Sequence, residues 1–273
     1  MKIIRKRKAL ITGAASGIGR AIALALAQEG ADLYLVDIDK EGLAITAEAV
    51  GRLGVEVITY VCDLADPKQV GSVVTSVRSA WNRLNILVNN AGTAYYGPTH
   101  EMTGDQWDKI LRVNLLTPIQ LVRELLPVLS AQDEAHIVNV SSIFGLVPMR
   151  KGAAYQTSKF GLVGFSAALR AEYGRWDFGV TALCPGFVHT AMIEEFETIG
   201  DQRRHQIPSW MCTSAERVAR QTVIAIRRNK ALVVISPIAH LLWFVMRLSP
   251  RFLGWVTREG WRERRRVVIG PPR

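Results

Sequence analysis

The sequence predicts an α/β fold in which helices cover both faces of a mostly parallel, seven-stranded sheet, with a helical extension at the C-terminus. Two observations lead to this fold class. Short runs of apolar and β-branched residues alternate along the chain with longer segments of helical periodicity. These runs are almost wholly apolar, as is typical of strands that helices cover on both sides. The chain has 273 residues, 49% of them hydrophobic, and is long enough to bury such a core.

Seven segments have the composition of buried strands. They are residues 9–12, 32–37, 55–63, 85–90, 136–142, 180–184 and 231–236. Helix-start signals lie between several of them. The clearest are Asp66-Pro67, as N-cap and first helical residue, and the capping boxes Thr103 to Gln106 and Thr213 to Glu216. Strands that alternate with helices predict parallel pairing through crossover helices.

The last predicted strand is followed by an extension. The longest uncharged run, 231–246, has sixteen residues, fewer than the roughly 20 that a membrane-spanning helix needs. We predict instead a strand and then a helix, which Ser249-Pro250 ends before a second helix begins. The apolar positions of the first helix are Ile238, Leu241, Leu242 and Val245. We therefore expect one domain at 1–236 and an extension at 237–273.

The basic residues gather at the two ends of the chain. Residues 1–8 carry a net charge of +5 and residues 247–273 one of +6, so the middle of the chain nets −1 out of a total of +10. A nucleic-acid enzyme needs its basic surface around the functional cleft. We therefore expect no nucleic-acid partner.

Three cysteines, Cys62, Cys184 and Cys212, occur at wide and unpatterned spacing. They indicate neither a disulfide framework nor a metal site, and they favour a reducing cytoplasm. The start MKIIRKRKAL is similar to the basic front of a signal peptide, but the segment that follows is interrupted by glycines from Gly13 onward. We expect no cleavable signal.

A glycine-rich turn joins the first predicted strand to a helix in the segment ALITGAASGIG. Gly13, Gly17 and Gly19 would let the backbone approach a pyrophosphate, whose charge the helix N-terminus favours. The alternative is a tight strand-to-helix turn without a ligand. Asp37 closes the second strand, where a carboxylate would bind the ribose hydroxyls of NAD and repel the 2′-phosphate of NADP. Alternatively, Asp37 only starts a turn.

Tyr155 and Lys159 lie four residues apart, on one face of a predicted helix. A phenol titrates too high to be a base at neutral pH, and an adjacent positive charge lowers its pKa. The pair therefore suits acid/base chemistry. Taken alone, such a pair also occurs on solvated helix faces.

Six motifs in order give the sequence a strong resemblance to the short-chain dehydrogenase/reductase family. They are TGAASGIG at 12–19, NNAG at 89–92, Asn114, VNVSS at 138–142, YQTSK at 155–159 and PGFVHT at 185–190. The resemblance covers roughly residues 8–235. It implies a Rossmann-like sheet, an NAD(P)-dependent activity on CH–OH groups, and a homodimer or homotetramer.

The resemblance also implies four catalytic residues. Tyr155 would be the general acid/base, and Lys159 would lower its pKa and hold the nicotinamide ribose. Ser142 rather than Ser141 would orient the substrate oxygen. Asn114, inside the predicted helix 105–116, would hold a water that links Lys159 to solvent. The alternative for Asn114 is a hydrogen bond between helices.

The cofactor site that the resemblance implies runs along the same strand ends. Its residues would be Gly13, Ser16, Gly17, Ile18, Gly19, Asp37, Ile38, Asp63, Leu64, Asn90, Ala91, Gly92, Tyr155, Lys159, Pro185, Gly186, Val188 and Thr190. Because Ile38 and Asp39 follow Asp37, with no arginine beside it in sequence, NAD is favoured over NADP. Cys184 is expected to be buried filler.

Apolar side chains in the segment 187–212 predict a loop that closes over an apolar substrate. The expected substrate contacts are Ser142, Phe144, Met149, Phe187, Met192 and Phe196. Sterols, retinoids, fatty alcohols and ketoacyl groups all fit that prediction. The alternative is that these side chains only pack the loop onto the domain.

The extension combines five large aromatic residues with an arginine cluster. It could lie on an anionic membrane or pack on a partner subunit, and the apolar helix favours the subunit. The leading functional hypothesis is an NAD-dependent alcohol dehydrogenase or ketone reductase. The alternatives are an NADPH-dependent carbonyl or ketoacyl reductase, and a non-catalytic nucleotide-binding scaffold or membrane-recruited regulator.

Overall fold

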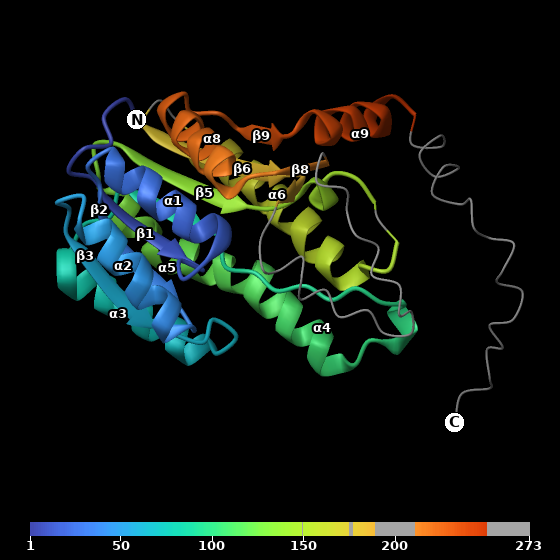
Figure 1. Ribbon diagram of the computed structural model, residues 1–273, viewed down its shortest axis with the longest axis horizontal. Helices are drawn as coiled ribbons and strands as arrows, with labels where there is room; N and C mark the ends of the chain where they lie inside the picture. The colour runs from blue at the N-terminus through green and yellow to red at the C-terminus, as the bar shows by residue number, and fades with distance from the viewer. Residues whose placement is uncertain (149, 175–176, 189–210, 250–273) are drawn as a thin grey trace, which may run out of the picture.

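The computed structural model describes residues 1–148, 150–174, 177–188 and 211–249. Its centre is a seven-stranded sheet with the order β3-β2-β1-β4-β5-β6-β9, in which every neighbouring pair is parallel (Figure 1). The strands are β1 Lys8–Thr12, β2 Asp32–Asp37, β3 Val57–Val61, β4 Ile86–Asn89, β5 Ala135–Val140, β6 Phe178–Pro185 and β9 Leu232–Ile235. Two short strands, β7 Phe187–Val188 and β8 Cys212–Thr213, pair beside it.

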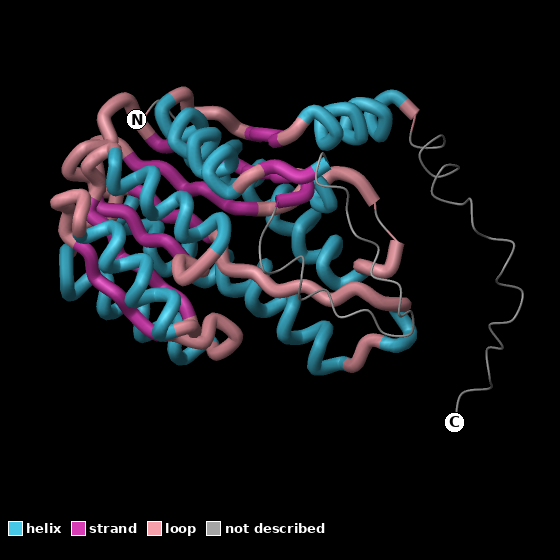
Figure 2. Tube along the Cα trace, in the orientation of Figure 1, coloured by secondary structure: helices cyan, strands magenta, loops and turns pink. Residues whose placement is uncertain are grey.

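The sequence prediction of seven parallel strands is confirmed, and helices lie on both faces of the sheet (Figure 2). The predicted ends differ from the observed ones by at most two residues. The largest functional difference is in β5, which ends at Val140 although the apolar pattern continued to Ser142. Ser142 instead accepts a hydrogen bond from the Phe144 backbone N–H and caps the short 3-10 helix η3, Ile143–Gly145.

Helices divide into two layers that bury opposite faces of the same strands. The helices and helical segments are α1 Gly17–Gln28, α2 Lys40–Gly51, α3 Pro67–Trp81, η1 Thr99–Glu101, α4 Gly104–Leu111, the π-helix η2 Arg112–Leu116, α5 Thr117–Ser130, α6 Ala153–Tyr173, α8 Ala215–Arg227 and α9 Pro237–Leu248. Ile11 belongs to the core with α1, α2 and α8, whereas Leu10 belongs to the core with α3, α5 and α6. Successive strand side chains point to opposite faces, which is why an uninterrupted apolar run is needed.

Two of the three predicted helix starts are correct. Asp66 accepts a hydrogen bond from the Lys68 backbone N–H at the start of α3, and Thr103 forms its capping box with Gln106. The third prediction is wrong by one residue. Ser214 is the N-cap of α8, because Thr213 is held in β8 opposite Val188.

The predicted helix after β9 is present as α9 and ends at Leu248, before Ser249. Its inner side packs on η3 and the residues after it. Leu241, which was expected on the apolar packing face, is instead 61% exposed. The second helix predicted after Pro250 lies outside the described residues. Within the described residues, no helix is both long enough and apolar enough to cross a membrane.

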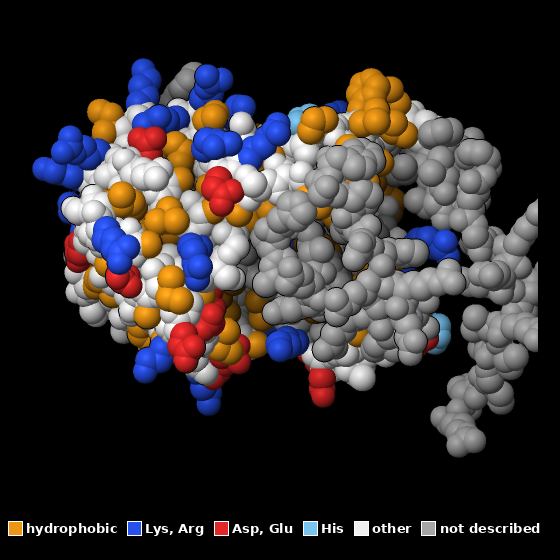
Figure 3. Space-filling view, in the orientation of Figure 1, with side chains coloured by type: hydrophobic (Ala, Val, Ile, Leu, Met, Phe, Trp, Pro, Cys, Tyr) orange, Lys and Arg blue, Asp and Glu red, His pale blue; other side chains and the backbone are white. Residues whose placement is uncertain are grey.

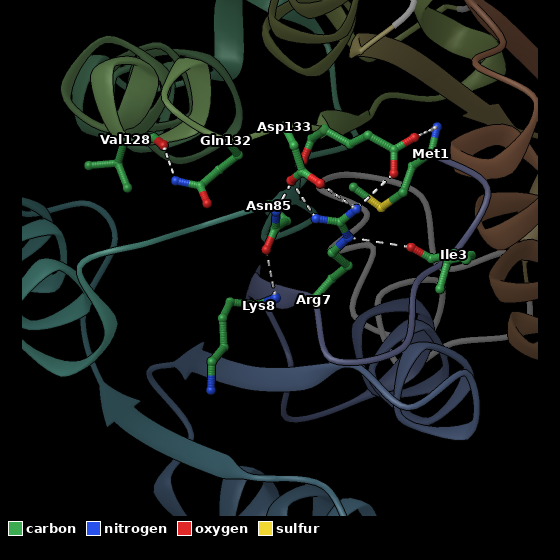
Figure 4. Close-up of polar contacts among 9 residues, drawn as sticks. Met1, Ile3, Arg7, Lys8, Asn85, Val128, Gln132 and Asp133 are labelled. Carbon is green, nitrogen blue, oxygen red and sulfur yellow. Dashed lines mark hydrogen bonds and ion pairs between the residues drawn. The ribbon is translucent and has the colours of Figure 1, made fainter.

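Part of the basic N-terminus is neutralised inside the fold (Figure 4). Arg7 pairs with Asp133 at 2.6 Å and with Glu134 at 2.8 Å. Lys8, nearly buried, pairs with Asp32 at 3.0 Å and also with a second carboxylate, Glu56. These pairs join the start of β1 to the start of β2 and to the residues just before β3 and β5, at the edge of the sheet where the strands begin. The charges of Arg7 and Lys8 are therefore structural and do not form a binding surface.

His136 on β5 predicts how stability changes with pH. Burial, with smaller contributions from the N-terminal charge and Arg170, lowers the pKa of His136 to about 3. Below about pH 6.5 the unfolded chain binds a proton that the folded chain does not, so stability falls by about 1.4 kcal/mol per pH unit toward about pH 3. His136→Gln should remove that share. Urea unfolding of the wild type and of His136→Gln at about pH 6 and about pH 5 tests this. If both proteins lose the same unfolding free energy between the two pH values, the prediction is contradicted.

Candidate active site

The glycine-rich turn between β1 and α1 has a backbone that only glycine fits well. Gly13 and Gly17 have positive φ angles of +67° and +49°. A methyl group at Gly19 would overlap the carbonyl oxygen of Gly13, so the turn and the first helical turn pack with no room between them. The sequence predicted a tight turn at these glycines, and in the structure the backbones of Gly13 and Gly19 are in close contact.

The N-terminus of α1 is open to an anion. Ser16 is its N-cap residue but makes no side-chain capping hydrogen bond, and the first turn holds no acidic residue. Free N–H groups and the helix dipole favour a negatively charged group at this point. The predicted cofactor residues Ser16, Gly17 and Ile18 therefore form the end of a helix that suits a pyrophosphate.

Asp37 lies beside this turn, at the carboxyl end of β2. Its carboxylate accepts hydrogen bonds from the backbone N–H groups of Ala15, at 2.8 Å, and Asp39, at 3.1 Å. Ile38 next to it is 64% exposed. Asp37 is thus more than a turn residue, because it contacts the glycine-rich segment across 22 positions of sequence.

Sequence reasoning did not anticipate Arg20 near the same turn. Its guanidinium donates to the carbonyl oxygen of Ala15 and, at 2.9 Å, to the hydroxyl of Thr46. No arginine lies beside Asp37 in sequence, but Arg20, from the first turn of α1, contacts the same glycine-rich turn. Its hydrogen bonds to α2 and to the turn hold it in place as a structural group.

Thr12 is a second residue that sequence reasoning missed. Its hydroxyl accepts from the backbone N–H groups of Asn90, at 3.0 Å, and Ala91, at 3.1 Å. The Asn90 side chain returns hydrogen bonds of 3.0 Å to the carbonyl oxygens of Thr12 and Gly13. The motifs TGAASGIG and NNAG are thus joined by four hydrogen bonds, which a pattern of letters does not reveal.

Asp63 and Leu64 follow β3, on the same edge of the sheet as Asp37. The Asp63 carboxylate accepts from the Ala65 backbone N–H at 2.8 Å. The carbonyl oxygen of Leu64 accepts from the Thr117 hydroxyl at 2.7 Å, and the Leu64 side chain is buried. Both residues therefore lie at the carboxyl end of β3, and their contact with an adenosine stays a prediction.

The two groups expected at the reacting oxygen meet at the end of β5. Ser142 directly follows that strand, and Tyr155 comes from the first turn of α6. The Ser142 side chain acts to lower the pKa of Tyr155, so the two side chains face each other, and both residues are more than nine-tenths buried. The pair needs two separate elements, a strand end and a helix start, to be held at the same point.

Lys159 lies one helical turn beyond Tyr155 and is also buried. Its ammonium donates to the carbonyl oxygen of Val140 at 3.0 Å and lies 5.6 Å from the centre of the Tyr155 ring. Burial lowers the pKa of Lys159 to about 8, so the group is mostly charged at neutral pH. The expected fall in the pKa of Tyr155 is not found. Burial raises this pKa, and the hydrogen bond with Ser142 only partly opposes the rise.

Asn114 connects this site to the strand β4. It lies in the π-helix η2, where sequence predicted continuous α-helix, and it is fully buried. Its amide accepts from the Thr93 N–H and donates to the Thr93 carbonyl oxygen, both at 2.8 Å, and it donates to the Ser158 hydroxyl at 3.1 Å. The side chain therefore makes the interhelical bond that was the alternative. Such π-segments often occur at functional sites.

Small residues around Lys159 complete the packing of the site. A Cβ at Gly92 would lie 3.6 Å from the Lys159 ammonium. The Ser141 hydroxyl donates to the Lys159 backbone carbonyl oxygen at 2.9 Å and so joins the end of β5 to α6. Ser142, not Ser141, is the serine paired with Tyr155. Cys184 is fully buried, and burial raises the pKa of its thiol to about 12. Cys184 is therefore filler, as expected.

The predicted nicotinamide and substrate walls are only partly within the described residues. Pro185 ends β6, the Gly186 N–H donates to the Ile235 carbonyl oxygen at 3.0 Å, and Val188 is buried in β7. Phe144 and Phe187 contact edge to face, with ring centres 5.6 Å apart. The other residues expected there lie outside the described part of the chain. They are Met149, Thr190, Met192 and Phe196.

Comparison with known proteins agrees with this geometry. A family model described as short chain dehydrogenase matches residues 7–199. The chain is 36% identical over 213 residues to the 3-oxoacyl-[acyl-carrier-protein] reductase FabG of Thermotoga maritima, covering 77% of this chain and 86% of that protein. It is 33% identical over 255 residues to the probable oxidoreductase EphD of Mycobacterium tuberculosis, covering 89% of this chain but only 43% of the longer EphD.

Solved structures are similar over nearly the whole chain. A short chain dehydrogenase/reductase from Burkholderia phymatum in complex with NAD has a TM-score of 0.81 and 27% identity, covering 92% of this chain and 96% of that one. An actinorhodin polyketide ketoreductase variant with NADPH has a TM-score of 0.77 and 27% identity, covering 86% and 97%. Both nicotinamide dinucleotides thus occur among proteins of this architecture.

The close packing of the glycine-rich turn gives a test. Gly19→Ala would force the turn apart, and we expect it to weaken NAD binding at least about tenfold and to cost about 1–3 kcal/mol of stability. Gly71→Ala in α3 is the matched control, because no atom lies within 4 Å of the added methyl group. Calorimetric titration with NAD and thermal unfolding measure both effects. NAD binding to Gly19→Ala as tight as to the control would contradict this account of the turn.

Proposed function

The chain belongs to the short-chain dehydrogenase family, and from that premise we propose that it moves a hydride between NAD(H) and the carbon of an apolar alcohol or ketone, with Tyr155 as acid/base. Family membership makes it an NAD(P)-dependent oxidoreductase acting on CH–OH or keto groups. The observation that carries the finer proposal is the buried pair of Ser142, directly after β5, and Tyr155, in the first turn of α6, with the Lys159 ammonium 5.6 Å from the centre of the Tyr155 ring. It lies on the sheet edge that also holds the glycine-rich turn.

In this proposal the Tyr155 hydroxyl donates its proton to the substrate oxygen as a carbonyl becomes an alcohol, and takes the proton back in the reverse reaction. The Ser142 hydroxyl donates a hydrogen bond to the same oxygen and orients it. A bound nicotinamide supplies or accepts the hydride. Because burial raises the pKa of Tyr155, the phenol keeps its proton at neutral pH and is ready to act as the acid when a ketone is reduced.

Lys159 and Asn114 have supporting roles next to Ser142 and Tyr155. We propose that the Lys159 ammonium holds the nicotinamide ribose and replaces the proton that Tyr155 gives up. Both N–H donors of the Asn114 side chain are used by Thr93 and Ser158, so we propose that the backbone of the π-helix holds a water near Lys159. Asn114 then acts by keeping that backbone in place.

The proposed cofactor is NAD, on the strength of the carboxylate of Asp37 beside the glycine-rich turn. A carboxylate there accepts hydrogen bonds from ribose hydroxyls and repels a 2′-phosphate. A second candidate is an NADPH-dependent ketoacyl reductase. It is favoured by the similarity of the chain to a 3-oxoacyl reductase and to an NADPH-bound ketoreductase. Arg20, whose guanidinium lies at Ala15, would have to leave its present partners to bind a phosphate.

The proposed substrate is apolar, supported by the packed rings of Phe144 and Phe187 next to Ser142. We further propose a homodimer or homotetramer in the cytoplasm, with a catalytic domain at 1–236 and an accessory extension at 237–273. A non-catalytic scaffold has no chemical reason to keep Ser142, Tyr155 and Lys159 together in a buried site.

The acid/base role gives the first test. Tyr155→Phe removes one hydroxyl oxygen from a packed site, so NAD binding should change by less than about threefold, while turnover should fall by about 10²-fold or more. Turnover is followed by NADH or NADPH absorbance with a panel of apolar ketones and alcohols. Ser141→Ala is the control, because it removes a buried hydroxyl next to the site without touching the reacting oxygen. Unchanged turnover in Tyr155→Phe would remove Tyr155 from the mechanism.

Cofactor choice gives the second test. The protein should bind NAD at least about tenfold more tightly than NADP, and Asp37→Ala should erase most of that difference, because one or two hydrogen bonds to a charged group are lost. Calorimetric titration measures both dissociation constants. Asp39→Ser is the matched control, since it removes a neighbouring charge and keeps a helix cap. Tighter binding of NADP by the unmodified protein would make the NADPH-dependent reductase the better proposal.

A further inference from the structure

Three large apolar side chains project from the outer side of α9. Leu241 is 61% exposed, Phe244 60% and Leu248 69%. Their spacing of three and four residues puts them on one side of the helix, which we call the α9 outer face. Figure 3 shows the hydrophobic side chains that gather over α9 at the upper right of the molecule. Single exposed apolar residues are common, whereas three aligned along one helix mark a binding surface.

The inner side of the same helix is firmly attached to the active site. Ala239 is buried, and Leu242 and Val245 pack with Ile143 and Val147. Ile143 directly follows Ser142, the residue proposed to orient the substrate. The α9 outer face is therefore held at a fixed position, one helix diameter from the segment that lines the catalytic site.

The charged side chains that the structure describes on α9 and along the adjoining pocket are all positive, namely Arg247, Arg217 and Lys230. The helix Pro237–Leu248 contains no acidic residue, and its exposed side also carries His240 and Arg247. His240 lines an adjoining pocket of about 370 Å³ together with Arg217 and Lys230, and no acidic residue is among its lining residues. The chemistry of this surface fits an apolar phase bordered by negative charge.

That charge pattern distinguishes two occupants. A two-fold contact between copies brings the same patch against itself, so each cation would need an acid on the identical patch. The described α9 outer face and its pocket offer none. An anionic lipid surface supplies both missing partners, an apolar interior for Leu241, Phe244 and Leu248 and phosphate groups for the cations.

We propose that the α9 outer face docks on the surface of an anionic lipid bilayer, with α9 parallel to the membrane plane. This deepens the function proposed above, because α9 and η3 would then hold the catalytic site next to the phase in which an apolar alcohol or ketone is dissolved. Docking itself needs no turnover. Failure of the proposed chemistry would leave it intact, and failure of docking would leave the chemistry intact.

The test is sedimentation of the full chain with vesicles. One vesicle contains phosphatidylglycerol and phosphatidylcholine in about equal amounts, and the other contains phosphatidylcholine alone. Wild type should bind the anionic vesicle at least about tenfold more tightly, and the difference should shrink as salt rises. Leu241→Asp/Phe244→Asp should lower that binding at least about tenfold, because it removes two large apolar side chains from the contact. Leu241→Ala/Phe244→Ala should give a smaller loss.

Ile45→Asp is the matched control, since Ile45 is 58% exposed on α2, away from α9. It should bind vesicles as wild type does, and all variants should keep the wild-type unfolding temperature. The proposal is overturned if wild type does not bind anionic vesicles, or if the double Asp variant binds them as wild type does. It is also overturned if, without vesicles, the double Asp variant dissociates a wild-type oligomer in analytical ultracentrifugation, because the face would then belong to a second copy.

Discussion

Parallel pairing of the seven strands is the constraint on which the site depends. Because all strands run in one direction, their carboxyl ends lie at a single edge of the sheet, and several of them contribute groups to the site there. The glycine-rich turn leaves β1, Asp37 ends β2, Asn90 follows β4 and Ser142 follows β5. An antiparallel sheet would have sent alternate groups to opposite edges. The backbone N–H groups of Asn90 and Ala91 donate hydrogen bonds to the Thr12 hydroxyl and hold two of these strand ends together.

Burial sets the electrostatics of the catalytic groups. Desolvation pushes the pKa of Tyr155 up and that of Lys159 down, so each shift favours the uncharged form. The Lys159 ammonium is satisfied by the Val140 carbonyl oxygen, not by the phenol, and so its charge does little for Tyr155. Sequence spacing alone suggested that the ammonium would dominate. Spacing gives the separation of two groups along a helix and does not give the dielectric or the competing acceptor around them.

The helix α9, which follows β9, has a packed inner side and an exposed outer side. The inner side supports the segment after Ser142, and the outer side leaves Leu241, Phe244 and Leu248 in contact with solvent. A periodic apolar pattern predicts that a helix forms, but when apolar residues surround the helix it does not identify the buried side. This is why Leu241 was placed on the wrong side. It is also why the docking surface emerges only once the helix is seated on the sheet.

The sequence alone determined the seven strands, their parallel arrangement and the glycine-rich turn, because apolar periodicity and turn-forming glycines are local properties of the chain. The site residues were expected from six motifs that resemble a known family. The sequence could not reveal Thr12, Arg20 or Ser141, whose partners lie across the fold in other elements. Nor could it show that η2 becomes a π-helix around Asn114, or that Ser214 rather than Thr213 caps α8. Those features depend on which segments meet in space, and only the tertiary structure decides that, since hydrogen bonds and desolvation act between neighbours regardless of their distance along the chain.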